Sequence, residues 1–376
     1  MNRVLKKEPE KQFLKILTRM GENALTNSRK MTVKDTAIVD HPVPPTLDSD
    51  TLSRIFSAQA PYSNSDEENL CLSLADALTD RERESAARTS FAYWAASTSP
   101  SDDDETTGLR PAVDNSVRRR MAARMVRRHM AQGRLAKCDP GACLEDVRSC
   151  LRFRERRDLD SLRLCFFRRG GDSGGHGSKT TNDEVELEPH SVPLSLLLEY
   201  ESQIAKDLST QPMAVCGMDP DRRAIVVKCS RTTSECDEEA YVLSHLYTAE
   251  RAIAATEWAS GGVEEKVVAM MDFADYGEGH RPPIQAIRRL IGEMQAVYPE
   301  RLEKMLVLNP PFWMRALFGV VRVFLDKDVR NKVELVSGEK QIAQALGSLS
   351  FDLTDDMDID RYLRDVPFFL SNRDVK

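Results

Sequence analysis

The sequence predicts an α/β fold with a mixed, largely parallel sheet, and two observations in the second half of the chain support this. A hairpin pattern occurs at 213–229, apolar runs of strand length occur at 266–273 and 302–309, and a shorter one follows Lys332. Stretches with apolar residues three and four positions apart separate these runs, as in amphipathic helices. Strands that alternate with helices pair through crossover connections, so most neighbouring strands should be parallel.

The segments before this region differ in composition. Residues 1–110 are expected to be largely disordered or loosely helical, because turn-forming and acidic Ser/Asp-rich stretches interrupt them at 41–50 and 97–105. A small helical domain is predicted over 111–168. A Gly-rich, polar segment at 169–191 is read as a linker. The α/β domain then occupies 192–376.

The predicted small helical domain is basic. Between Arg118 and Arg169 there are sixteen Lys or Arg residues against six Asp or Glu. Nucleic-acid binding would favour interleaved aromatic side chains, and none occurs between Arg118 and Leu151. Two interpretations stay open: a solvated basic surface, or attraction to an anionic membrane or lipid phosphate.

The elements of the α/β domain follow from their patterns. Apolar spacing predicts helices over 192–208, 237–258 and 284–297. Residues 213–229 read as a β-hairpin whose turn contains Asp219-Pro-Asp221. Residues 266–273 and 302–309 read as buried strands, the second closed by Asn309 and two prolines.

Residues 312–325 are predicted to form a helix that is apolar on nearly every side. Arg315 and Arg322 are its only charged residues, and seven positions separate them, so both point the same way. Such a helix should be buried or should cover something apolar, such as lipid.

Composition and motifs disfavour several classes of function. The formal net charge of −7 gives no field that would attract nucleic acid, and no apolar run reaches the roughly 18 residues of a membrane span. The eight cysteines contain no Cys-x-x-Cys pair, and the six histidines are scattered. GGDSGGHGSKT lacks the Lys directly after Gly that a phosphate loop needs. No nucleophile, metal or cofactor site is therefore expected, and an enzyme is disfavoured.

Residues 298–336 resemble the CRAL-TRIO lipid-binding domain, the family that includes phosphatidylinositol transfer proteins. The resemblance rests on the order of YPERL, an apolar strand, Asn-x-Pro, an aromatic-rich helix, FLD and a Lys before an apolar strand. Residues 134–154 resemble the small helical domain that precedes the lipid domain in that family. The resemblance implies a lipid pocket under a gating helix.

It also implies the residues of the site. Lys137, Glu300 and Lys332 correspond to residues that bind the phosphatidylinositol headgroup, although a Glu–Lys pair is otherwise an ordinary salt bridge. The gate and pocket are expected to use apolar side chains that could equally be ordinary core: Phe312, Trp313, Leu317, Phe318, Val321, Phe324, Val268 and Met270. Val267 and Ala269 stand where hydroxyl residues help to hold phosphatidylcholine, so phosphatidylinositol is favoured.

The sequence thus predicts a cytoplasmic lipid-exchange protein that binds one phospholipid and contacts membranes transiently. No nucleic-acid partner and no cofactor are expected, and the oligomeric state is open. Two alternatives remain: a carrier of an uncharged hydrophobe, such as a tocopherol or retinoid, and an adaptor that targets its N-terminal region to a membrane.

Overall fold

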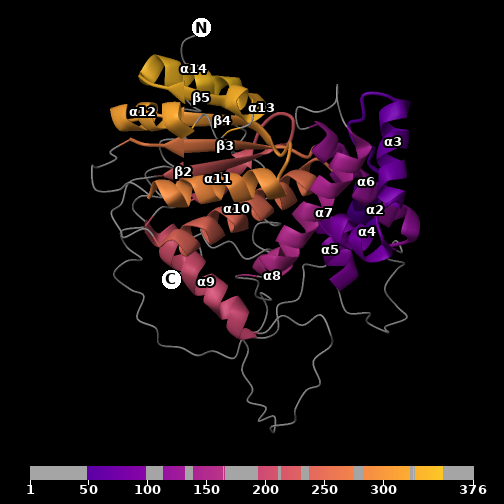
Figure 1. Ribbon diagram of the computed structural model, residues 1–376. Coiled ribbons are helices and arrows are strands. Elements are labelled where there is room, and N and C mark those ends of the chain that lie inside the picture. Colours follow the sequence, from indigo (N-terminus) through magenta and orange to yellow (C-terminus); the bar gives the residue numbers. More distant parts are fainter. Residues whose placement is uncertain are drawn as a thin grey trace, which may run out of the picture.

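The computed structural model describes residues 49–98, 113–131, 139–163, 165, 194–210, 213–229, 237–274, 283–321, 325 and 327–349. A helical layer comes first and a five-stranded sheet with flanking helices follows (Figure 1). The helical layer contains α2 (Ser49–Ser57), α3 (Ser65–Asp76), α4 (Asp80–Ala87), α5 (Phe91–Thr98), α6 (Asn115–Ala131), α7 (Pro140–Arg156) and α8 (Leu159–Leu162). None of the helices within these ranges is both long and apolar enough to cross a membrane.

The sheet has the order β1-β2-β3-β4-β5, which is also the order along the chain. Its strands are β1 (Met213–Met218), β2 (Ala224–Cys229), β3 (Val267–Asp272), β4 (Leu302–Leu308) and β5 (Val333–Val336). β1 pairs antiparallel with β2, and the other pairs are parallel. The predicted hairpin, the two later strands and the mixed, largely parallel sheet are confirmed.

The first hairpin is closed by one aspartate. Asp219 Oδ1 accepts hydrogen bonds from the backbone N–H groups of Asp221 and Arg223, at 2.9 and 2.8 Å. An Asp side chain that bonds the backbone two residues on stabilises a turn locally. The turn chemistry of the sequence therefore predicted this connection.

Helices connect the parallel strands and cover the sheet. They are α9 (Leu194–Thr210), α10 (Glu238–Ala259), α11 (Ile284–Val297), α12 (Phe312–Val321), α13 (Lys327–Lys332) and α14 (Glu339–Leu349). α10 begins after Asp237, whose side chain caps the N–H groups of Glu239 and Ala240. α10 and α11 lie on one side of the sheet and α14 on the other (Figure 1). Of the helix predicted over 312–325, the structure describes Phe312–Val321 as α12, and residues 322–324 lie outside the described residues.

Helices α2 to α5 fall within the region expected to be largely disordered or loosely helical. Leu52, Ile55 and Phe56 of α2 share one apolar core with Trp94 of α5 and with β1 residues such as Val215. Trp94 is 2 % exposed. Helices α2 and α5 are therefore packed against the edge of the sheet, while α3 shares a core with α6 and α7.

Four arginines of α6 and α7 are buried in ion pairs instead of lying on a solvated surface. Arg124, Arg127 and Arg128 all contact Glu265, at 2.8, 2.6 and 2.8 Å between nitrogen and oxygen. Arg154 contacts Glu250 at 2.8 Å. These six side chains are buried or nearly so, and their ion pairs join the helical layer to the sheet layer. Neither sequence interpretation of the basic segment anticipated this use.

Candidate functional site

The Tyr-Pro-Glu-Arg turn before β4 is fixed by its first and last side chains. The Tyr298 hydroxyl donates to Glu250 Oε1 at 2.8 Å, and Arg301 Nη1 donates to the backbone oxygen of Glu265 at 2.9 Å. Between them, Glu300 has a left-handed backbone with φ of 55°. Non-glycine residues seldom adopt this conformation, so the anchored neighbours set the direction in which Glu300 is presented.

Glu300 and Lys332 form an ion pair between the starts of two neighbouring strands. Lys332 Nζ lies 3.1 Å from Glu300 Oε2, and the two side chains are 19 % and 16 % exposed. Lys332 ends α13 and directly precedes β5, while Glu300 stands just before β4. The pair therefore bridges the amino ends of two adjacent parallel strands, and the structure brings together two residues that the sequence assigned to one site.

Lys332 also lines a cleft of about 450 Å³. This volume lies within the range of small-molecule sites. The lining comes from the β1–β2 turn, from β3 to β5 and from the end of α14: Asp219, Pro220, Asp221, Arg223, Val268, Glu303, Lys304, Asn331, Lys332, Glu334, Ser348 and Leu349. Four carboxylates, of Asp219, Asp221, Glu303 and Glu334, and three cations, of Arg223, Lys304 and Lys332, line it. The charged lining suits a polar group better than an acyl chain.

Ion pairs fix the other charged groups at this end of the sheet. Lys266 Nζ lies 2.8 Å from Glu303 Oε2, and Lys304 Nζ lies 2.9 Å from Glu334 Oε2. Burial alone would raise the pKa of Glu303, but the hydrogen bond from Lys266 and nearby positive charges lower it. Glu303 is therefore an anion at neutral pH, and its negative charge repels an anionic group in the cleft.

Helix α12 lies by the opposite, carboxyl ends of β4 and β5 (Figure 1). Arg315 Nη2 donates to Ser337 Oγ, just after β5, at 2.5 Å. Phe312, the first residue of α12, is 87 % exposed, whereas Met314 and Phe318 are half-buried. The side chains of Trp313, Leu317 and Val321, and all of Phe324 and Lys137, lie outside the described residues.

Val268 and Met270 sit on the sheet face that α14 covers. Each is 1 % exposed and belongs to a core that includes Leu306 and Leu346. Their neighbours along the strand point to the other face, because side chains alternate. On that face several apolar side chains are only half-buried although they lie on β3, β4 and β5: Ala269, Met271, Met305 and Leu335.

The CRAL/TRIO domain model matches residues 208–349, which contain the whole sheet and helices α10 to α14. Residues 208–349 form a CRAL/TRIO domain. The chain is 36 % identical over 83 residues to a phosphatidylinositol transfer protein, PDR17, of Saccharomyces cerevisiae. That alignment covers 21 % of this chain and only 23 % of PDR17.

Among solved structures, the crystal structure of Sfh5 matches 56 % of this chain and 66 % of its own. The sequence identity is 11 % and the TM-score 0.36. The assignment of residues 208–349 to the CRAL/TRIO domain therefore rests on the domain match and on the mixed sheet described above, and not on this superposition.

The sequence did not single out the residues that position the site. The side chain of Glu250, on α10, is 2 % exposed and binds Arg154, Arg163 and Tyr298. Its signal was a carboxylate among the apolar residues of a long helix. A buried charge needs partners, so such a residue indicates an ion pair that the chain must supply elsewhere. Within the described ranges, no three His, Cys, Asp or Glu side chains gather into a possible metal site.

Proposed function

We propose that the protein binds a phospholipid of the phosphatidylinositol type and exchanges it between membranes as a peripheral, cytoplasmic protein. The observation that carries the proposal is the Glu300–Lys332 pair, which the CRAL/TRIO domain presents beside a polar cleft. A lysine binds phosphate as a point charge, and a carboxylate accepts hydrogen bonds from hydroxyl groups. Together they match a phosphorylated polyol. Lys137 is retained in this proposal as a further cation.

The acyl chains would lie on the sheet face opposite α14. That face offers Ala269, Met271, Met305 and Leu335, which are half-buried, and methionine adapts to flexible chains. Val268 and Met270 are core residues on the other face, so we no longer assign them to the slot. The seven residues of β4 span roughly 20 Å, comparable with the ~15 Å depth of one membrane leaflet. The Glu300–Lys332 pair at the amino ends of β4 and β5 would hold the headgroup, and the chains would run along this face toward α12, whereas Val268 and Leu349 place the cleft itself on the α14 side.

The central experiment is native mass spectrometry of the purified protein, combined with transfer of phosphatidylinositol between liposomes. Lys332→Ala should lower transfer roughly tenfold or more, because charge-assisted hydrogen bonds contribute about 1.5–3 kcal/mol. Lys266→Ala is the matched control, since Lys266 forms a similar pair with Glu303 but does not line the cleft.

Exchanging the two charges distinguishes a pair that binds the lipid headgroup from a salt bridge that has no part in binding. In the double variant Glu300→Lys/Lys332→Glu the ion pair can still form, so stability should be retained while phosphatidylinositol transfer is lost. Transfer equal to wild type would refute the headgroup role. Extraction of a tocopherol or retinoid would favour the uncharged-hydrophobe carrier instead.

Absence of any extracted lipid would favour the adaptor. Its test removes residues 1–48 rather than 1–110, since α2 and α5 share a core with β1. Transfer should survive this truncation if the protein is an exchange protein.

A further inference from the structure

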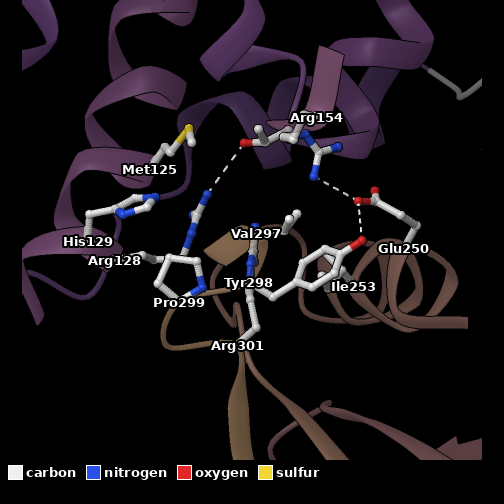
Figure 2. Close-up of a pocket in the computed structure, with 11 residues that line it drawn as sticks. Met125, Arg128, His129, Arg154, Glu250, Ile253, Val297, Tyr298, Pro299 and Arg301 are labelled. Carbon is white, nitrogen blue, oxygen red and sulfur yellow. Dashed lines mark hydrogen bonds and ion pairs between the residues drawn. The ribbon is translucent and has the colours of Figure 1, made fainter. Parts of the chain in front are cut away.

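A second, much smaller cavity lies between the helical layer and the sheet layer. Its volume is about 10 Å³, which is room for one water-sized particle. Figure 2 shows it bounded by α6 and α7 on one side and by α10 and the turn before β4 on the other. Its lining comprises Thr89, Met125, Arg128, His129, Arg154, Glu250, Ile253, Val297, Tyr298, Pro299 and Arg301.

The charges around the cavity do not balance. Three arginines line it, Arg128, Arg154 and Arg301, against one carboxylate, Glu250. Their direct partners add Arg124, Arg127 and Arg163 on the positive side and Glu265 on the negative side. Even with Glu257, whose charge acts on Arg301, and Asp160, which pairs with Arg163 at 3.8 Å, six arginines face four carboxylates among the described residues.

Glu250 and Glu265 each accept hydrogen bonds from more than one of these side chains. Glu250 uses Oε1 for Arg154 and Tyr298 and Oε2 for Arg163. Glu265 binds three arginines with its two oxygens. Their negative charge is therefore divided, and the surplus positive charge stays in a region of low dielectric, where it is costly.

One donor at the cavity has no hydrogen-bond partner within the described part of the chain. Arg154 is 8 % exposed, and while its Nη1 donates to Glu250, its Nη2 is buried without an acceptor. An unsatisfied buried donor on a charged group is expensive. Burial, followed by repulsion from Arg301, lowers the pKa of Arg128 to about 9, so this side chain is still charged at neutral pH.

We propose that this cavity is a binding site for a single small anion, chloride being the abundant ion of suitable size. The ion would accept a hydrogen bond from Arg154 Nη2 and offset the charges of Arg128 and Arg301. A phosphate or carboxylate is too large for the space. Because Tyr298, Pro299 and Arg301 line the cavity, the anion would fix the turn that presents Glu300. The inference is independent of the proposed lipid.

Thermal unfolding tests the site in solution. At constant ionic strength, replacing sodium gluconate with 100 mM sodium chloride should raise the Tm by roughly 5 °C, as expected for an ion that binds only the folded state in the millimolar range. Arg154→Lys keeps a positive charge for Glu250 but lacks Nη2, and should abolish most of the chloride-dependent shift. Arg152→Lys on the same helix, where Arg152 is exposed and pairs with Glu145, should leave it unchanged.

Crystals of the wild-type protein grown in sodium bromide test the site without any substitution. An anomalous peak beside Arg128, Arg154 and Arg301 is expected. A Tm that is equal in chloride and gluconate, or a crystal with an ordered water and no anomalous signal at this place, would overturn the proposal.

Discussion

At the residue scale, a few side chains decide how the CRAL/TRIO domain presents its site. Glu300 keeps an unfavourable backbone conformation because Tyr298 and Arg301 are bound on either side of it. Such conformations cost on the order of 1–3 kcal/mol and persist only when their surroundings impose them. The two anchors therefore belong to the site although neither needs to touch a ligand.

Gly261 and Gly262 offer a matched pair for testing how α2 docks. Both have positive φ, 62° and 82°, but a Cβ at Gly262 would lie 3.0 Å from Ile55 backbone and side-chain atoms, and one at Gly261 would meet nothing. Both alanine variants should lose stability through backbone strain. Gly262→Ala should lose roughly 1–3 kcal/mol more, because it overpacks the α2 contact.

Urea unfolding of the two variants measures this difference. Equal losses would show that Ile55 moves aside freely, and α2 would then not be tightly docked at this position.

At the element scale, the sequence predicted the sheet well and the surface helices less well. Strands and crossover helices such as 266–273 and 284–297 carry strong periodic signals, because one face of each is buried locally. Helices α2 to α5 lie in the region described as largely disordered or loosely helical, and what the sequence could not predict is the docking of α2 and α5 on a distant partner, the edge strand β1. Local composition cannot report a contact between residues more than a hundred positions apart.

The faces of the sheet were also beyond sequence reasoning. Alternation along β3 separates Val268 and Met270 from Ala269 and Met271, but it does not say which face α14 covers. For the pair at Glu300 and Lys332, the spacing of the family pattern sufficed, because both residues are at the start of adjacent parallel strands. Because backbone hydrogen bonds fix how the two strands align, residues at the starts of both strands come close together.

Helix α12 supplies a prediction about membranes. Phe312 is 87 % exposed at the start of a helix whose one charged residue is Arg315, so it can enter a bilayer before the rest of the helix moves. Burying one such side chain contributes about 1.5–3 kcal/mol. Phe312→Asp should therefore weaken association with phosphatidylinositol-containing vesicles at least tenfold and slow lipid transfer without lowering the Tm.

Vesicle sedimentation and transfer assays measure both effects. Val263→Asp is the control, because Val263 is 57 % exposed but lies in the loop between α10 and β3. If Val263→Asp reduces binding as much as Phe312→Asp, the loss reflects charge alone and α12 is not the contact.

At the scale of the whole molecule, two carboxylates bind the helical layer to the CRAL/TRIO domain. Glu265 joins α6 to the start of β3, and Glu250 joins α7 and α8 to α10. Both are buried with several arginines, so removing either carboxylate leaves uncompensated charge in the interior. The relative placement of the two layers, and with it the site turn, should depend on their ionisation.

This dependence predicts a specific loss of stability in acid. Burial alone would raise the pKa of Glu250, but the charges and hydrogen bonds of Arg154, together with Arg163, lower it to about 2. A carboxyl whose folded pKa lies below its unfolded value of about 4.3 stabilises the fold above that value, and loses this contribution as pH falls toward 2. The contribution is about 3 kcal/mol at neutral pH. Urea midpoints should therefore fall steeply between pH 4.5 and 2.5.

Glu250→Gln should be much less stable at pH 7 and show a flatter decline below pH 4.5, whereas Glu145→Gln, at an exposed ion pair on α7, should follow the wild type. Parallel curves for wild type and Glu250→Gln would mean that this network does not hold the two layers together.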